Sequence, residues 1–168
     1  KELVFRYTPN EYTVTFDPNG GTLTGEKNTK PVNFGSKYGQ LLTATREGYT
    51  FDGWFTEKDG GKQVTDKTVV KTAGDHTLYA HWTPKNDVSY TVKYVHAKNG
   101  KELAAAKTVK DQTFDTTVTE TAVVIPGYTV DEETKTLKLD AYDKELVFRY
   151  TPNEYTVTFD PNGGTLTG

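Results

Sequence analysis

The chain contains no cysteine and no methionine, two serines and three histidines among its 168 residues. Without cysteine there is no disulfide framework, no thiolate metal site and no cysteine nucleophile. Neither Ser36 nor Ser89 lies in the Gly-x-Ser-x-Gly sequence that positions a nucleophilic serine. The paired glycines fit hairpin turns rather than a phosphate-binding loop. We therefore expect neither an enzyme nor a bound cofactor.

A strong charge of one sign and long apolar runs are also missing. The formal net charge is −3, with lysines and acidic residues interspersed. Nucleic-acid binding needs a basic face, so no nucleic-acid partner is expected. No apolar run is long enough to span a bilayer and no signal peptide is visible, so no membrane insertion is expected. We interpret the chain as an interior fragment whose targeting signals lie outside it.

The candidate metal ligands are scattered. His76, His81 and His96 are not clustered as a zinc site requires, and His81 alternates with apolar neighbours, which predicts a solvent-facing position. The acidic run 131–133 lacks the alternating oxygen ligands around a glycine turn that calcium prefers. No metal site is expected. A structural calcium ion and a covalent Lys–Asn crosslink stay open, because sequence alone cannot bring the required side chains together.

The residues that are abundant favour strands. Thirty threonines and eleven tyrosines stand beside many valines, and these side chains fit a pleated sheet. Hydrophobic residues make up 34% of the chain, so any core is expected to be thin. A mostly antiparallel β protein is therefore expected.

An internal repeat governs the organisation of the chain. Residues 1–25 read KELVFRYTPNEYTVTFDPNGGTLTG, and residues 144–168 repeat them letter for letter, 143 positions later. The chain is therefore one period of a tandem array and the start of the next. An enzyme needs one good site, whereas interchangeable copies supply length or valency.

Each period divides into two modules with one skeleton. Each module opens on Tyr-Thr-Val, turns on Asn-Gly, passes through Gly-Tyr-Thr and closes on an alternating strand that ends in Thr-Pro, where the strand ladder must stop. Residues 11–84 form module one and residues 85–152 form module two. Residues 1–10 are the closing strand of a preceding module, and residues 153–168 are the opening strand of the next repeat.

The sequence of two segments fits either a strand or a short helix. Residues 37–42 are long enough for one helical turn, and the Thr-rich residues 114–124 are spaced so that one or two turns fit. The joints between modules are only a few residues long, which predicts a stiff rod rather than modules on flexible tethers. Residues 1–9 and 153–168 have lost their sheets and are expected to be disordered in an isolated molecule.

Three motifs of module one, in order, resemble the Listeria–Bacteroides repeat of the internalin B-repeat type. They are residues 12–21 (YTVTFDPNGG), 48–54 (GYTFDGW) and 78–82 (LYAHW). Module two resembles the mucin-binding-protein (MucBP) repeat through four shorter motifs, which are YTVKY at 90–94, NGKEL at 99–103, PGY at 126–128 and LVFRY at 146–150.

These resemblances imply a fold and a cellular setting. They imply α+β modules, mostly antiparallel β, with a small β-grasp-like fold in which a short helix or loop crosses a curved sheet. Both repeat families occur in tandem on Gram-positive surface proteins anchored to the cell wall. Neither is known as an enzyme, so no catalytic residues are implied.

The aromatic residues have two interpretations. Rings on a surface stack on sugars, whereas a module this small needs its large rings for burial. Phe51 and Trp82 occupy the inward-facing positions of strands with alternating side chains, and they are assigned to the core. Tyr79, Tyr90 and Tyr128 are expected to be partly exposed, and they are the candidate glycan-contact residues.

The sequence thus predicts a non-catalytic segment of a cell-surface adhesin. In the first hypothesis, a monomeric, stiff stalk projects a binding tip, and its partners are neighbouring repeats of the same chain. In the second, the modules bind host mucin or glycans weakly and repetition supplies avidity.

Overall fold

The computed structural model describes residues 2–25 and 27–165, which form strands, turns and loops without a helix. The mostly antiparallel β class in tandem modules is confirmed, but its helical component is absent from these residues. The helical turns considered for residues 37–42 and 114–124 are wrong. The second segment contains strand β10 (Thr117–Thr121), whose threonine and valine side chains suit a pleated surface better than a helix.

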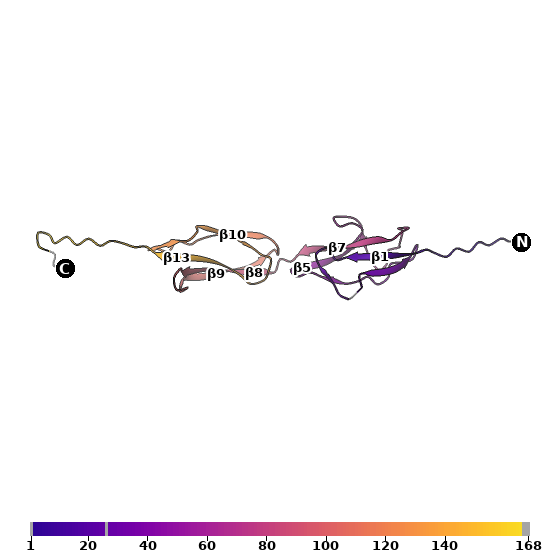
Figure 1. Ribbon diagram of the computed structural model, residues 1–168, viewed down its shortest axis with the longest axis horizontal. Coiled ribbons are helices and arrows are strands. Elements are labelled where there is room, and N and C mark those ends of the chain that lie inside the picture. Colours follow the sequence, from indigo (N-terminus) through magenta and orange to yellow (C-terminus); the bar gives the residue numbers. More distant parts are fainter. Residues whose placement is uncertain (1, 26, 166–168) are drawn as a thin grey trace. The chain divides into compact units, whose positions relative to one another are not determined.

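Two compact units make up the fold (Figure 1). Unit 1 runs to Val88 and also includes Gln112–Asp115, and unit 2 comprises Ser89–Asp111 and the chain from Thr116 onward. Each unit has a sheet of its own.

Unit 1 is built on a five-stranded sheet in the order β3-β1-β7-β5-β6, with β2 and β4 paired separately. The central strands β1 and β7 are parallel, and the other pairs are antiparallel. Its strands are β1 (Glu11–Asp17), β2 (Thr22–Leu23), β3 (Thr29–Asn33), β4 (Ala44–Thr45), β5 (Tyr49–Phe55), β6 (Gln63–Val64) and β7 (His76–Pro84).

The core of unit 1 lies on one face of this sheet. Alternating side chains of β1 and β7 are buried there, because successive strand residues point to opposite faces. Phe16 meets the ring of Trp54 edge-on at 4.8 Å between centroids. The indole N–H of Trp54 donates to the carbonyl oxygen of Leu42 at 2.8 Å. The large aromatic side chains therefore hold the loop between β3 and β5 over the sheet.

Unit 2 is built on a four-stranded sheet in the order β11-β13-β8-β9, beside an antiparallel β10–β12 pair. Here β8 and β13 are parallel, and β11 runs antiparallel to β13. Its other strands are β8 (Val88–His96), β9 (Glu102–Gln112), β11 (Tyr128–Val130), β12 (Thr134–Lys138) and β13 (Lys144–Pro152).

The two units share one strand arrangement. In each, the first and last long strands lie side by side and parallel in the middle of the sheet, and a strand from the middle of the unit flanks the last one. The resemblances imply small, mostly antiparallel β-grasp-like modules but predict no strand order, so the parallel central pair is seen only in the structure. A loop in unit 1 and the β10–β12 pair in unit 2 stand where a helix was expected.

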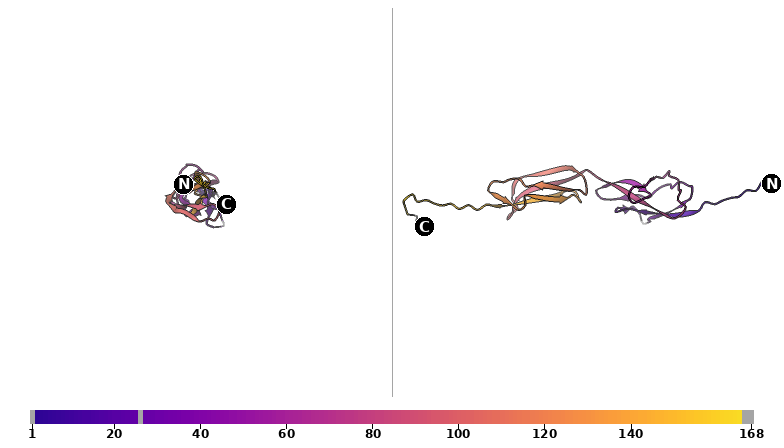
Figure 2. Two further views of the ribbon diagram at one scale, coloured as in Figure 1. Left: turned by 90° about the vertical axis from the view of Figure 1, so that its left-hand side faces the viewer. Right: turned by 90° about the horizontal axis from the view of Figure 1, so that it is seen from above.

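The described ends of the chain, residues 2–10 and 153–165, contain no strand (Figures 1 and 2). Residues 2–9 repeat the sequence of β13, and residues 154–160 repeat that of β1. We call them the unpaired copy of β13 and the unpaired copy of β1. The predicted loss of sheet partners is confirmed for these residues, and their disorder stays a prediction.

Candidate binding sites

The three candidate glycan-contact tyrosines lie on three different strands. Tyr79 is half-buried on β7 of unit 1, whereas Tyr90 on β8 and Tyr128 on β11 belong to unit 2. The structure therefore does not gather them into one site, and each must be considered with its own surroundings.

Tyr90 is buried, so its predicted partial exposure is wrong. Only 4% of its surface is accessible, and its hydroxyl donates to Oε1 of Glu120 at 2.6 Å. The amine of Lys107 donates to both oxygens of the same carboxylate, at 2.9 and 2.8 Å. With its hydroxyl bonded inside the unit, Tyr90 cannot serve as a sugar-stacking surface.

Buried charge in this cluster is compensated by hydrogen bonds. Burial and the bond to Glu120 raise the pKa of Tyr90 to about 12. Burial alone would raise the pKa of Glu120, but the hydrogen bonds from Lys107 and Tyr90 outweigh it and hold that pKa below its usual value. The cluster therefore holds an ionised carboxylate between β8, β9 and β10, and its role is structural.

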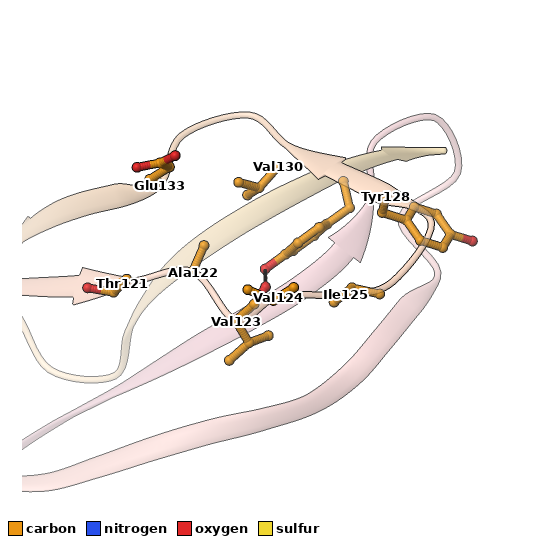
Figure 3. A pocket seen from close by; sticks show the side chains of 9 residues that line it. Thr121, Ala122, Val123, Val124, Ile125, Tyr128, Val130 and Glu133 are labelled. Carbon is orange, nitrogen blue, oxygen red and sulfur yellow. Dashed lines mark hydrogen bonds between the residues drawn. The ribbon is translucent and has the colours of Figure 1, made fainter. Parts of the chain in front are cut away.

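Tyr128 is half-buried, and its ring meets that of His96 edge-on at 6.1 Å between centroids. It lines a pocket of about 280 Å³ in unit 2 (Figure 3). Most of the other lining side chains are aliphatic, and the hydroxyl of Tyr150 in the pocket donates to the carbonyl oxygen of Val123 at 2.7 Å. The lining is Thr121, Ala122, Val123, Val124, Ile125, Tyr128, Val130, Glu133 and Tyr150.

This pocket suits an apolar group better than a sugar. Its carboxylate, Glu133, and the hydroxyl of Thr121 are the non-aromatic polar side chains of the lining. Sugar recognition needs several hydrogen-bonding groups around an aromatic ring. Tyr128 therefore remains a predicted glycan contact with few polar neighbours to orient a ligand.

A polar pocket of about 300 Å³ lies in unit 1 and was not anticipated from the sequence. Charged and amide side chains surround an indole there, which is the combination that sugar binding uses. It is lined by Asn19, Arg46, Asp52, Lys58, Asp59, Gly60, His81 and Trp82. No spacing rule could have found it, because Asn19 in the turn after β1 and Trp82 on β7 are far apart in sequence and meet only through the parallel pairing of β1 with β7.

The pocket walls are held by the fold itself. The amide of Asn19 donates to the carbonyl oxygen of Ala80 at 3.0 Å, and the indole N–H of Trp82 donates to the carbonyl oxygen of Pro18, also at 3.0 Å. The ring centroids of Phe51 and Trp82 lie 5.2 Å apart, and both side chains pack against the core of unit 1. Their assignment to the core is therefore confirmed. His81 stacks on Phe55 at 3.9 Å and is half-buried rather than fully solvent-facing.

Within residues 2–25 and 27–165, no three His, Asp or Glu side chains are close enough together to hold a metal ion. In the same part of the chain, no helix is long and apolar enough to cross a membrane.

Comparison with known proteins identifies the first module. Residues 12–81 match the Listeria-Bacteroides repeat domain, so the resemblance seen in its three motifs is confirmed. Internalin H of Listeria monocytogenes is 39% identical over 85 residues, which cover 51% of this chain and 14% of internalin H. Module one is thus similar to the Listeria-Bacteroides repeat domain and to a part of internalin H.

Relatives that align with both modules are more distant. A putative Gly-rich membrane protein of Evansella cellulosilytica is 27% identical over 173 residues, covering 97% of this chain and 19% of its own length. This chain thus spans less than a fifth of either relative. The type 2 repeat of the mucus binding protein MUB from Lactobacillus reuteri is similar at 17% identity with a TM-score of 0.31, covering 85% of this chain and 99% of the repeat. A TM-score this low does not establish a shared fold. The resemblance of module two to the MucBP repeat therefore rests on its sequence motifs.

Proposed function

We propose that this chain is a non-catalytic segment of a repetitive stalk on a bacterial adhesin, which carries a binding tip away from the cell wall to which the protein is anchored. The observation that carries this proposal is the letter-for-letter repeat. Copies that differ nowhere over twenty-five residues supply length, because each added period adds the same units again.

Short connections support the stalk. Three residues separate β7 from β8, and one residue, Asn153, separates β13 from the unpaired copy of β1. Short connections leave little slack for bending, which is what a stiff stalk requires.

Small-angle scattering on chains of one, two and three periods tests this proposal. We expect the maximum dimension to rise linearly with the number of periods. A matched variant with twelve Gly/Ser residues inserted after Lys85 should lose this linear rise. Compact particles, or dimensions that grow as those of a random coil, would contradict the stalk.

Weak multivalent binding of host glycans or mucin is the second candidate function, and the polar pocket of unit 1 favours it. Charged and amide groups around Trp82 offer a sugar both an aromatic edge and hydrogen-bond partners. A glycan array probed with one-period and three-period chains tests it, since three linked weak sites raise the apparent affinity by about 10²-fold or more. Asp59→Ala and Lys58→Ala should weaken binding in this pocket, and Tyr128→Ala should weaken it in unit 2. Absence of binding at either length would remove this function.

A further inference from the structure

Strand β9 lies at one edge of the four-stranded sheet of unit 2, with β8 as its neighbour. At eleven residues it is the longest strand in the described part of the chain. The other edges of the two large sheets are protected, because β6 and β11 have two and three residues and Pro31 removes a donor in the middle of β3. β9 contains no proline, so it is the edge most open to a further strand.

Alternate residues of β9 turn their backbone groups outward. Residues 97–101 join β8 to β9, and so short a connection makes the two strands an antiparallel hairpin. The carbonyl oxygen of Lys101, directly before β9, accepts from the N–H of His96 in β8 at 2.8 Å. Since inward and outward positions alternate along a strand, the backbone groups of Ala104, Ala106 and Thr108 point away from β8, toward the open edge.

A side chain covers the centre of this edge. The backbone N–H of Ala106 donates to Oε1 of Glu102, on the same strand, at 3.1 Å. Glu102 is exposed, and water competes for an exposed hydrogen bond. Glu102 therefore guards the central donor without closing the edge to another strand.

The sequence of β9 is complementary to itself in one antiparallel register, in which Ala106 lies opposite Ala106 of a second copy. Leu103 then faces Val109, and Glu102 faces Lys110, and two-fold symmetry makes each pair occur twice. Apolar pairs and opposite charges stabilise neighbouring strands, and an ammonium group has three donors, enough for Glu102 and for groups of its own chain. A register centred one residue later would set two lysines opposite each other, and like charges directly opposite destabilise. A register centred one residue earlier would separate Glu102 from Lys110.

We propose that β9 pairs with β9 of a second copy of this chain, antiparallel and with Ala106 opposite Ala106. The four-stranded sheets of the two copies of unit 2 become one continuous sheet across a two-fold axis, which is a closed contact. Glu102 leaves the N–H of Ala106, which then donates to the carbonyl oxygen of Ala106 of the second copy, and its carboxylate binds Lys110 of that copy. A single pair of edge strands buries little surface, so the contact is weak. It goes beyond the stalk and glycan-binding roles, because it joins two copies of the chain and depends on neither role.

An exchange of charges in the full chain tests this register. Glu102→Lys and Lys110→Glu each set like charges opposite one another at both ends of the paired strands, so each variant alone should stay monomeric. Mixed in equal amounts, the two variants restore opposite charges at both ends and should form mixed dimers. Sedimentation equilibrium should show the mass of the parent and of the mixture rising from one chain to two between about 10 µM and about 1 mM.

Two further variants serve as controls. Lys98→Glu makes the same charge change in the turn before β9 and should associate like the parent. Ala106→Pro removes the outward donor at the two-fold axis, at a position where an edge strand tolerates proline, so it should be a monomer with the circular dichroism of the parent.

NMR of a mixture of labelled and unlabelled parent tests the register without any substitution. Residues 105 and 107 of different copies lie opposite each other in this register, so a contact between their Hα atoms is expected. A contact in another register would overturn the proposal, as would a parent that stays monomeric at about 1 mM or a mass above two chains. Association of either charge variant alone to the extent of the parent would overturn it too, and so would two folded charge variants that fail to associate when mixed.

Discussion

Residues 10–22 and 153–165 have identical sequences and different surroundings, which makes them a controlled comparison within one molecule. In the first copy, β1 is paired with β3 and β7. In the second, the described residues form no strand. Yet the turn that follows is the same in both: Asn19 and Gly20 have φ of 45° and 88°, and Asn162 and Gly163 have 47° and 91°.

The hydrogen bonds of the turn are also reproduced. The backbone N–H of Asn19 donates to Asp17 Oδ1 at 2.8 Å, and that of Asn162 donates to Asp160 Oδ1 at 2.8 Å. The turn is therefore a property of five local residues, in which asparagine and glycine accept positive φ and aspartate caps the turn. A strand is different, because its hydrogen bonds and its buried face must come from elsewhere in the chain.

Deletion of one or the other copy of the β13 sequence should give the largest difference in folding between the two copies. Removal of residues 144–168 takes the central strand out of unit 2, so we expect unit 2 to unfold completely. Removal of residues 1–9 deletes the sequence that residues 144–152 carry and should leave both units folded. NMR spectra of the two truncated chains give the answer. Equal damage from both deletions would contradict the claim that the surroundings decide.

Single substitutions at the two copies of one phenylalanine sharpen this comparison. Phe148→Ala leaves a cavity beneath Tyr94 and should lower the free energy of unfolding of unit 2 by about 3–5 kcal/mol. Phe5→Ala changes an exposed side chain and should shift it by less than about 0.5 kcal/mol. Urea denaturation followed by circular dichroism measures both. A comparable loss at Phe5 would show that its ring is packed after all.

The two copies of one glycine test the packing of unit 1. A Cβ on Gly21 would come within 2.4 Å of the ring of Trp82 and 2.7 Å of the carbonyl oxygen of Thr45. Gly21→Ala should therefore destabilise unit 1 by about 1–3 kcal/mol. In Gly164→Ala, the new Cβ would lie 3.2 Å from the carbonyl oxygen of Pro161 and would contact no sheet. The melting temperatures of both units should therefore equal those of the parent. Thermal denaturation distinguishes the two variants.

Lowering the pH should weaken the contacts that hold β13 in unit 2. Of the four predictions, this one has the smallest expected effect on stability. Burial opposes ionisation of Asp131, but hydrogen bonds from Lys135 and from the backbone of Arg149 outweigh it and lower the pKa. The pKa of Glu120 is lowered as well. A carboxyl whose pKa is lower when folded stabilises above its unfolded pKa and loses that effect as the pH falls through the folded value.

The melting temperature of unit 2 is therefore expected to fall below about pH 4.5, near the ordinary range of Glu and Asp. Asp131→Asn with Glu120→Gln removes both groups, so its melting should depend less on pH in this window. If the parent and the variant lose stability in parallel, these carboxylates are not responsible.

Much of the fold was predictable because its signals are local. The alternation of residues 12–16, the turn that ends it and the Thr-Pro strand ends all depend on neighbours in sequence, and the structure confirms them. The parallel pairings of β1 with β7 and of β8 with β13 were not predictable in this way. Their partners lie far apart in the chain, and no single segment encodes its register with a distant strand.

The errors have two origins, which are local signals that were misread and a site that only tertiary pairing assembles. Tyr90 looked exposed in isolation, yet Val88, Tyr90, Val92 and Tyr94 alternate along one strand, and this pattern could have placed all four in the core. The helical turns of residues 114–124 were considered on spacing alone, although their β-branched residues favour a strand. The polar pocket of unit 1 could not be found, because tertiary pairing brings residues of β5 and β7 together with residues of three loops that are far apart in sequence.

Amide hydrogen exchange at residues 154–160 tests most directly whether the array itself supplies each strand with its partners. NMR would follow these amides in this chain and in a chain extended by one further period. We expect exchange at the unstructured rate here, and protection in the extended chain equal to that of residues 11–17. Protection already present in this chain, or fast exchange that persists after extension, would contradict the account.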